Sequence, residues 1–189
     1  MGQPQRKKRW DSFFRKRSIE ELFSNSLRIQ KCLQTFPPPD KLDFVSSYLF
    51  GPVHSGKTIY GAQMMLEYIR KNYMEGKRTE GVEYIPLTEL LLKIKQSYNS
   101  KNEIDEYSLI QHYTRLDFLL MDDIGTQYPT DWSVHILYLI INRRYEMQKI
   151  TVFTSNLSLN ELANNMMDDR IPSRIQAMCK TIKFEKQYL

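Results

Sequence analysis

Residues 46–58 read Ser-Ser-Tyr-Leu-Phe-Gly-Pro-Val-His-Ser-Gly-Lys-Thr, and this stretch decides the fold of the chain. A short apolar run leads into the pattern G-x-x-x-x-G-K-T, and a helical pattern follows directly. This order of strand, glycine-containing loop and helix is the context that a phosphate-binding loop requires. The backbone N–H groups of such a loop and the positive end of the following helix bind phosphates. The stretch therefore predicts a site for a nucleoside triphosphate.

Each residue type in this loop has a physical task. Gly51 and Gly56 allow backbone angles and close approaches that a Cβ would prevent. Lys57 is expected to reach the β- and γ-phosphates, and the Thr58 hydroxyl is expected to ligate Mg²⁺. We therefore predict that the whole loop binds the nucleotide: Gly51, Pro52, Val53, His54, Ser55, Gly56, Lys57 and Thr58.

A second landmark is the apolar run 118–121, which ends in two carboxylates, Asp122 and Asp123. Continuous apolar runs are typical of buried parallel strands, and ligands of such sheets lie at the carboxyl ends of the strands. Asp122 is predicted to hold the water shell of Mg²⁺, and Asp123 to orient and deprotonate the attacking water. The alternative is a helix cap followed by a turn. The position downstream of a phosphate loop favours the functional interpretation.

Further polar residues follow other apolar segments. Residues 149–155 have the composition of a strand, and Asn156 at its end can position water or contact the γ-phosphate. An asparagine after a strand is more often a turn residue, so Asn156 is a candidate only in the company of the other motifs. Arg170 and Arg174 are four residues apart and share one face if their segment is helical.

Hydrophobic periodicity predicts the remaining elements. A capping box that begins at Ser18 predicts one amphipathic helix over residues 18–35, which a run of prolines ends. Its apolar positions are Ile19, Leu22, Phe23, Leu27 and Leu33. Further helices are predicted over 59–73, 87–94, 107–113, 132–145 and 159–165, and further strands over 82–85 and 181–185. We expect a basic arm and a short helix over residues 1–40 and an α/β core over residues 41–189.

The bulk composition excludes several classes of protein. Hydrophobic residues make up 41% and charged residues 26% of the chain, which is typical of soluble globular proteins. No run of 18 or more apolar residues occurs, so a transmembrane helix is not expected, and the N-terminus lacks the features of a secretory signal. Cys32 and Cys179 lie far apart and are expected to be reduced thiols of a cytoplasmic protein.

The basic excess is confined to the start of the chain. Residues 1–17 contain seven Lys or Arg and one acidic residue, which leaves 20 basic and 21 acidic residues for the remainder. Trp10, Phe13 and Phe14 are interleaved with these cations, a mixture suited to phosphate contacts and base stacking. A solubilising tail or a protein-docking segment explains the same pattern equally well.

Together these segments resemble the AAA+ ATPases of the DnaC/DnaI helicase-loader and IstB transposition-helper group, over roughly residues 44–189. Residues 51–58 resemble Walker A, 119–126 the Walker B segment, 151–157 the sensor 1 strand and 169–174 the arginine-bearing segment. The resemblance implies a P-loop NTPase of the AAA+/ASCE type. Its expected fold is α/β, a doubly wound five-stranded parallel sheet with helices on both faces and a lid domain that is absent or minimal.

The resemblance also implies the site. ATP and Mg²⁺ would bind at subunit interfaces, with an arginine finger entering from the neighbouring subunit. Arg174 matches the finger position best, Arg170 is its companion, and Arg144 is a weaker candidate for a contact with the neighbour. His54 occupies a position where many relatives have glycine, and we interpret it as neutral. The implied catalytic residues are Lys57, Asp123, Asn156, Arg170 and Arg174, with Thr58 and Asp122 at the metal.

The leading functional hypothesis is an ATP-dependent DNA replication accessory protein. Such a protein, a helicase loader of the DnaC/DnaI type, would form ATP-dependent homo-oligomers, bind single-stranded DNA and position a replicative helicase. An IstB-like helper that directs a transposase has the same ATPase core. Two alternatives of another class are a P-loop kinase and a nucleotide switch that binds ATP without turnover.

Overall fold

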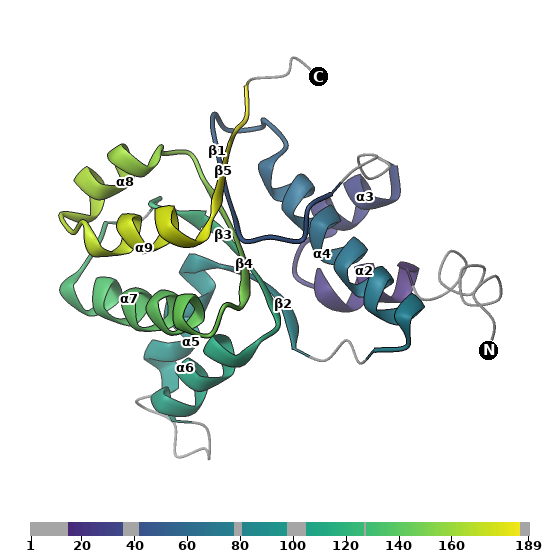
Figure 1. Ribbon diagram of the computed structural model, residues 1–189, viewed down its shortest axis with the longest axis horizontal. Coiled ribbons are helices and arrows are strands. Elements are labelled where there is room, and N and C mark those ends of the chain that lie inside the picture. Colours follow the sequence, from purple (N-terminus) through teal and green to yellow (C-terminus); the bar gives the residue numbers. More distant parts are fainter. Residues whose placement is uncertain (1–14, 36–41, 78–80, 98–104, 127, 186–189) are drawn as a thin grey trace.

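The computed structural model describes residues 15–35, 42–77, 81–97, 105–126 and 128–185 (Figure 1). Residues 1–14 of the basic arm, and the proline run 37–39 that is predicted to end the first helix, lie outside these ranges. The predicted boundary at residue 40 also falls outside them and stays a prediction. No helix of the described ranges is both long and apolar enough to cross a membrane.

One sheet of five parallel strands forms the centre of the molecule. The strands are β1 (Ser47–Phe50), β2 (Val82–Pro86), β3 (Phe118–Ile124), β4 (Ile150–Ser155) and β5 (Lys180–Lys183). Their order in the sheet is β2-β3-β4-β1-β5, so β3, β4 and β1 are the inner strands. The predicted five-stranded parallel sheet is confirmed.

Helices cover both faces of this sheet, as Figure 1 shows. One face carries α2 (Arg15–Leu22), α3 (Leu27–Thr35) and α4 (Lys57–Glu75). The other face carries α5 (Leu87–Ser97), α6 (Glu106–Arg115), α7 (Asp131–Glu146), α8 (Leu159–Met166) and α9 (Arg170–Met178). The predicted cover of both faces is therefore confirmed.

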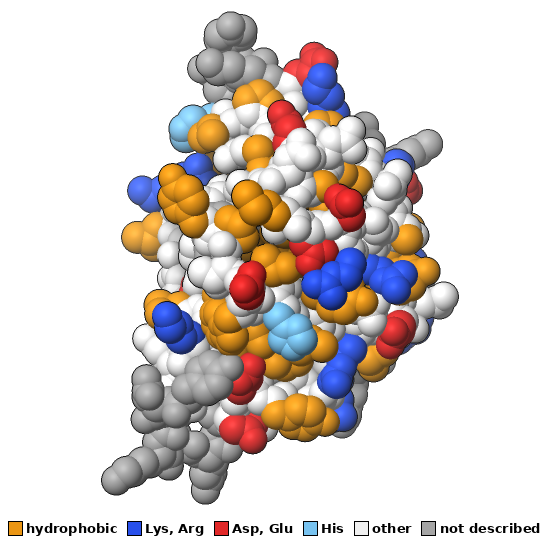
Figure 2. Space-filling model, turned by 90° about the vertical axis from the view of Figure 1, so that its left-hand side faces the viewer, with side chains coloured by type: hydrophobic (Ala, Val, Ile, Leu, Met, Phe, Trp, Pro, Cys, Tyr) orange, Lys and Arg blue, Asp and Glu red, His pale blue; other side chains and the backbone are white. Residues whose placement is uncertain are grey.

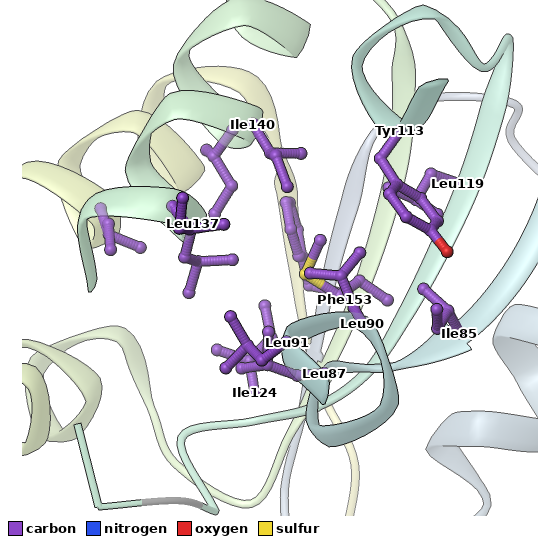
Figure 3. Close-up of a cluster of buried hydrophobic side chains, with 14 of the residues drawn as sticks. Ile85, Leu87, Leu90, Leu91, Tyr113, Leu119, Ile124, Leu137, Ile140 and Phe153 are labelled. Carbon is purple, nitrogen blue, oxygen red and sulfur yellow. The ribbon is translucent and has the colours of Figure 1, made fainter. Parts of the chain in front are cut away.

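Each face has its own hydrophobic core because successive side chains of a strand point to opposite sides. In β3, Leu119 and Met121 pack under α5, α6 and α7, whereas Phe118 and Leu120 pack under α4. Figure 3 shows side chains of α5, α6 and α7 gathered over β2, β3 and β4 on the first of these faces. Burial on both faces explains why β3 is an unbroken apolar run up to its carboxyl end.

Helix α4 lies unusually close to the sheet at Gly61. A Cβ at this position would lie 2.8 Å from Cδ1 of Leu120 and 3.4 Å from Cγ1 of Val152. A side chain at residue 61 would require the end of the Leu120 side chain to shift, so glycine suits this approach. Because α4 begins at Lys57, the close packing also fixes the end of the helix that follows the phosphate-binding loop.

The prediction of one helix over residues 18–35 is wrong, because a turn over residues 23–26 separates α2 from α3. This turn contains two serines and an asparagine, whose side chains compete with helical hydrogen bonds. Ser26 caps the second helix, since its Oγ accepts a hydrogen bond from the N–H of Ile29 at 3.4 Å. The Gln30 side chain donates to the carbonyl of Phe23 at 2.8 Å and closes the turn.

The turn changes which side chains of the N-terminal hairpin are buried. Ile19, Phe23, Ile29 and Leu33 pack in the same core as α4. Leu27, which a continuous helix would bury, is 71% exposed. The hairpin therefore belongs to the helical layer on this face of the sheet.

Arg144 of α7 is fully buried and makes four hydrogen bonds, so its predicted contact with a neighbouring subunit is wrong. Its Nε donates to Oγ1 of Thr151 at 2.8 Å, and its Nη2 donates to the carbonyl of Ile150 at 2.7 Å. Its Nη1 donates to the carbonyls of Tyr113 and Leu116 at 2.7 and 2.9 Å. The guanidinium thus joins α6, α7 and β4 within one chain.

The substitution Arg144→Met is expected to lower the free energy of unfolding by about 3 kcal/mol or more, because buried carbonyl groups lose their donor. Burial lowers the pKa of Arg144 to about 9, so the side chain is still charged at pH 7. Urea unfolding measures the change. Arg143→Met, at the preceding position of α7, is the matched control and should change the free energy of unfolding by less than about 0.5 kcal/mol. Equal effects of the two substitutions would contradict the structural role of Arg144.

Candidate nucleotide-binding site

The predicted phosphate-binding loop connects the carboxyl end of β1 to the first residue of α4. The N–H of Gly51 donates to the carbonyl of Ser155 at 3.2 Å, which fixes the start of the loop beside β4. Gly51 has φ +146°, and a Cβ there would lie 2.1 Å from the carbonyl oxygen of Phe184. A side chain at residue 51 is therefore excluded both by the backbone angle and by the backbone of Phe184, the residue that follows β5.

The tip of the loop is exposed, and part of it has the left-handed backbone conformation. Pro52, Val53 and His54 are exposed, whereas Ser55 is buried. His54 has φ +64°, a conformation that glycine adopts without strain and that costs most other residues free energy. The neutral role predicted for His54 is not tested by this geometry, but its backbone has the angle that a glycine would supply.

The Lys57 side chain folds back into the loop. It is 5% exposed, and its Nζ donates to the carbonyls of Gly51 and Pro52 at 2.9 and 2.7 Å. Its distance to Oγ of Ser55 is 3.4 Å. Burial lowers the pKa of Lys57, and the carboxylates at the end of β3 oppose this shift. The loop therefore encloses a cation.

Three hydroxyl groups hold the carboxylate of Asp122. Thr58 of α4 donates to Oδ1 at 2.9 Å, and Thr154 of β4 donates to the same oxygen at 2.5 Å. Tyr84 of β2 donates to Oδ2 at 3.2 Å, and its burial, together with this carboxylate, raises its pKa. Asp122 is 5% exposed, so these hydrogen bonds satisfy a carboxylate that has little contact with water.

Thr58 and Asp122 supply oxygen atoms of the kind that bind Mg²⁺. Mg²⁺ prefers oxygen ligands and usually keeps several waters, and the phosphates of a nucleotide complete its coordination. The described residues contain no group of three or more His, Cys, Asp or Glu that would form a cage by themselves. One hydroxyl and one carboxylate beside a phosphate-binding loop fit an ion that is bound together with its nucleotide.

Asp123 has an unusual backbone, with φ +59°, at an irregularity in the pairing of β3 with β4. Its N–H donates to Oγ1 of Thr154 at 2.9 Å, so Thr154 contacts both residues of the acidic pair. Partial desolvation and the neighbouring Asp122 raise the pKa of Asp123, while Lys57 and Arg28 oppose the shift. The side chain of Asp122 is buried and that of Asp123 is exposed.

The other predicted site residues divide into two groups. Asn156 is exposed and directly follows Ser155, whose carbonyl binds the N–H of Gly51, so its backbone lies beside the phosphate-binding loop. Arg170 and Arg174 lie on α9, which covers the sheet face opposite to α4 (Figure 1). The structure therefore does not bring these two arginines to the site of their own chain.

Three residues near the site were not predicted from the sequence. Tyr84 and Thr154 contact Asp122 from the two strands that flank β3. Arg28 lies on α3, and its charge acts on Asp123 and on Tyr84. Thr154 could have been found from its position two residues before Asn156, but only with the order of the strands in hand. Tyr84 and Arg28 carry no signal in the sequence.

A protein-family model matches most of the chain. The family described as IstB-like ATP binding protein matches residues 40–184. The Replicative helicase loader DnaC of Buchnera aphidicola subsp. Baizongia pistaciae is 27% identical over 92 residues, which cover 49% of this chain and 37% of that protein. The chain thus spans little more than a third of the length of this relative.

Solved structures with the same fold come from DNA replication proteins. The crystal structure of the DnaC helicase loader has a TM-score of 0.59 and 20% identity, and the alignment covers 84% of this chain and 86% of that chain. The structure of the replication initiator DnaA bound to AMPPCP and single-stranded DNA has a TM-score of 0.60 and 18% identity, with 84% and 44% coverage. At these identities the likeness shows a shared fold.

The left-handed angle at residue 54 leads to a prediction for nucleotide binding. His54→Val is expected to weaken ATP binding about tenfold, because a β-branched residue is strained by about 1–2 kcal/mol in this conformation. His54→Gly adopts the angle freely and should keep the affinity within about twofold. Titration with a fluorescent ATP analogue measures both. Equal affinities of the Val and Gly variants would show that this backbone angle does not limit binding.

Proposed function

The chain belongs to the family of IstB-like ATP-binding proteins, and from this premise we propose that it is an ATPase that helps to position a replicative helicase on single-stranded DNA. One observation carries the ATPase part of the proposal. Lys57, Thr58, Asp122 and Asp123 meet at the carboxyl ends of β1 and β3. A cytoplasmic location, expected from the sequence, is part of this proposal.

In the proposed mechanism the loop from Gly51 to Gly56 binds the phosphates of ATP through its N–H groups. Lys57 exchanges its present acceptors, the carbonyls of the loop, for β- and γ-phosphate oxygens. Thr58 and Asp122 would hold Mg²⁺, which supplies positive charge next to the phosphates when it is bound. The Tyr84 hydroxyl keeps Asp122 in place during this exchange.

Asp123 is proposed to orient the attacking water and to accept its proton. The raised pKa of this carboxyl makes it a stronger base than an ordinary aspartate. Its exposed side chain is accessible to water, while its backbone is fixed by Thr154. Asn156, beside the start of the loop, is proposed to position the same water or to contact the γ-phosphate.

Helix α9 is proposed to carry the arginine finger for a neighbouring copy of this chain, with Arg174 as the first candidate and Arg170 as its companion. Arg170 and Arg174 lie on the sheet face opposite to α4 and contact Tyr138, Tyr145 and Asp168, which supports a finger that is supplied by another subunit. A fixed guanidinium stabilises the charge that develops on the transferred phosphoryl group. This arrangement makes an ATP-dependent homo-oligomer part of the proposal.

The proposed partners are single-stranded DNA and a replicative helicase. The likeness to DnaC helicase loaders and to a DnaA structure with bound single-stranded DNA supports them. A transposition helper is the second candidate, because the matching family is described as IstB-like. Affinity capture with a purified hexameric helicase or a purified transposase as bait distinguishes the two: the partner that is retained in an ATP-dependent manner identifies the function.

One experiment separates the ATPase from a kinase and from a switch without turnover. Phosphate release and mass in solution are measured together, with and without single-stranded DNA and over a range of protein concentrations. We expect release that rises with protein concentration and responds to DNA. A kinase would be indifferent to DNA, and a switch would assemble with ATP without releasing phosphate.

Substitutions in the acidic pair and the loop are expected to separate binding from hydrolysis. Lys57→Ala should abolish ATP binding, because the loop loses its cation. Asp123→Asn should retain binding and lower hydrolysis by about 10²-fold or more, since the general base is lost. Equilibrium titration and phosphate release measure the two effects. Lys71→Ala, on the same helix α4, is the control that should behave as the unmodified protein. Unchanged turnover in Lys57→Ala would refute the assignment of the loop.

The basic arm leads to a prediction about salt. Replacement of Arg6, Lys7, Lys8 and Arg9 by Gln is expected to weaken binding of single-stranded DNA and to reduce the slope of log K against log salt by up to about 3. The reason is that each cation that contacts a phosphate releases counterions from the nucleic acid. Fluorescence anisotropy at several salt concentrations measures the slope. An unchanged slope would assign the arm to protein docking or to solubility.

A further inference from the structure

Two arginine–tyrosine pairs lie on the face of the molecule that is formed by α7 and α9. The buried side chains of Ile171 and Ile175 hold α9 against the core on this face. Arg170 and Arg174 each precede one of these residues and flank the buried stripe. Figure 2 shows this side of the molecule, where Lys and Arg side chains gather next to Asp and Glu side chains near the middle of the face.

Each arginine rests on a ring of α7. Cζ of Arg174 lies 5.1 Å from the ring centroid of Tyr145, and Cζ of Arg170 lies 4.9 Å from that of Tyr138. Both distances are within the range of cation–π contacts. The two tyrosines are seven residues apart, which is close to two helical turns, so their rings lie along one side of α7.

The two arginines differ in whether a carboxylate also binds the guanidinium group. The Arg170 guanidinium also binds the carboxylate of Asp168, with Nη2 to Oδ2 at 2.7 Å and Nε to both oxygens at 3.1 Å. Arg174 makes no ion pair and no side-chain hydrogen bond with any residue in the part of the chain that the structure describes. The charge of Arg170 is therefore paired with Asp168, and the charge of Arg174 has no such partner among the residues that the structure describes.

An aromatic ring supports a guanidinium in a way that a carboxylate does not. The ring attracts the cation through its π electrons and is not a carboxylate-type acceptor, so it does not pair with the five N–H donors as a carboxylate does. A carboxylate consumes two of these donors and neutralises the charge. Arg174 is thus held in place while its donors remain available for phosphate oxygens.

We propose that Tyr145 is a positioning residue: its ring holds the Arg174 guanidinium ready to enter the nucleotide site of a neighbouring copy of this chain, while Arg170 is retained by Asp168 on its own surface. This inference rests on the proposed ATPase function. It makes Arg174 alone the finger, and it gives α7 a part in a site that lies on another subunit. A guanidinium that is ordered before assembly loses less side-chain entropy when the interface forms.

The test compares aromatic and aliphatic residues at the same position. Tyr145→Leu is expected to lower kcat of the assembled protein about tenfold, with KM for ATP unchanged, because the nucleotide loop of each subunit is intact. Tyr145→Phe keeps the ring and should retain kcat within about twofold. Tyr138→Leu should have the smaller effect of the two leucine variants, since Asp168 still holds Arg170. Tyr107→Leu, an exposed tyrosine of α6, is the matched control.

A mixing experiment shows whether the effect crosses the interface. Tyr145→Leu subunits have an intact nucleotide site, and Lys57→Ala subunits have an intact Arg174 with its ring. At a mixed interface the second subunit can supply the finger to the first, so the mixture should release phosphate faster than either variant alone. A mixture that is no faster than its components would overturn the proposal.

Other outcomes separate the failure of this inference from the failure of the proposed function. If Arg174→Ala lowers turnover but Tyr145→Leu does not, the positioning role is wrong and the finger stands. If Arg174→Ala itself has no effect, the finger of the proposed function is wrong. Equal losses of kcat in Tyr145→Phe and Tyr145→Leu would show that the aromatic ring does not position Arg174. Each rate of phosphate release is divided by the concentration of subunits that bind an ATP analogue, so that only folded sites are counted. If Tyr145→Leu does not fold, Tyr145→Met replaces it.

Discussion

The site depends on one buried carboxylate, that of Asp122, and on the three hydroxyl groups that hold it. A carboxylate with little access to water is stable only when hydrogen bonds or a cation compensate its charge. Thr58, Tyr84 and Thr154 supply those bonds from α4, β2 and β4. Because β3 lies between β2 and β4, the order of the strands is what brings these hydroxyls together. The same bonds connect the first turn of α4 to the sheet and so orient the loop before it.

The sheet also separates two halves of the proposed chemistry. The phosphate-binding loop leads from the carboxyl end of β1 into α4 on one face, and the Arg174 guanidinium lies over Tyr145 on the face that carries α7 and α9. A chain with two such complementary surfaces on opposite sides can contact its neighbours head to tail. Heterologous contacts of this kind close into rings or extend as helical filaments, depending on the rotation between subunits. Under the proposed function, the layered fold itself would therefore favour assembly along a nucleic acid.

Features that depend on residues close together in the sequence could be predicted, whereas features that depend on contacts between distant residues could not. The loop at Gly51–Thr58 and the acidic end of β3 carry their chemistry in consecutive residues, and the five-stranded parallel sheet was implied by the family that these segments resemble. The break between α2 and α3 was missed because Leu27 continues the helical period although it is exposed. Arg144 was misassigned because an arginine near a helix end resembles a surface residue, and only the fold shows its buried carbonyl partners. The roles proposed for Asn156, Arg170 and Arg174 stay predictions.

The acceptors of Lys57 have a consequence for the thermodynamics of phosphate binding. Its ammonium group donates to two carbonyls inside the loop, so a phosphate that binds to this group has to replace them. Binding is then an exchange of ligands around one cation, and the measured affinity is the difference between two sets of contacts. The contacts inside the loop therefore lower the net affinity for any phosphate, that of the product as well as that of the substrate.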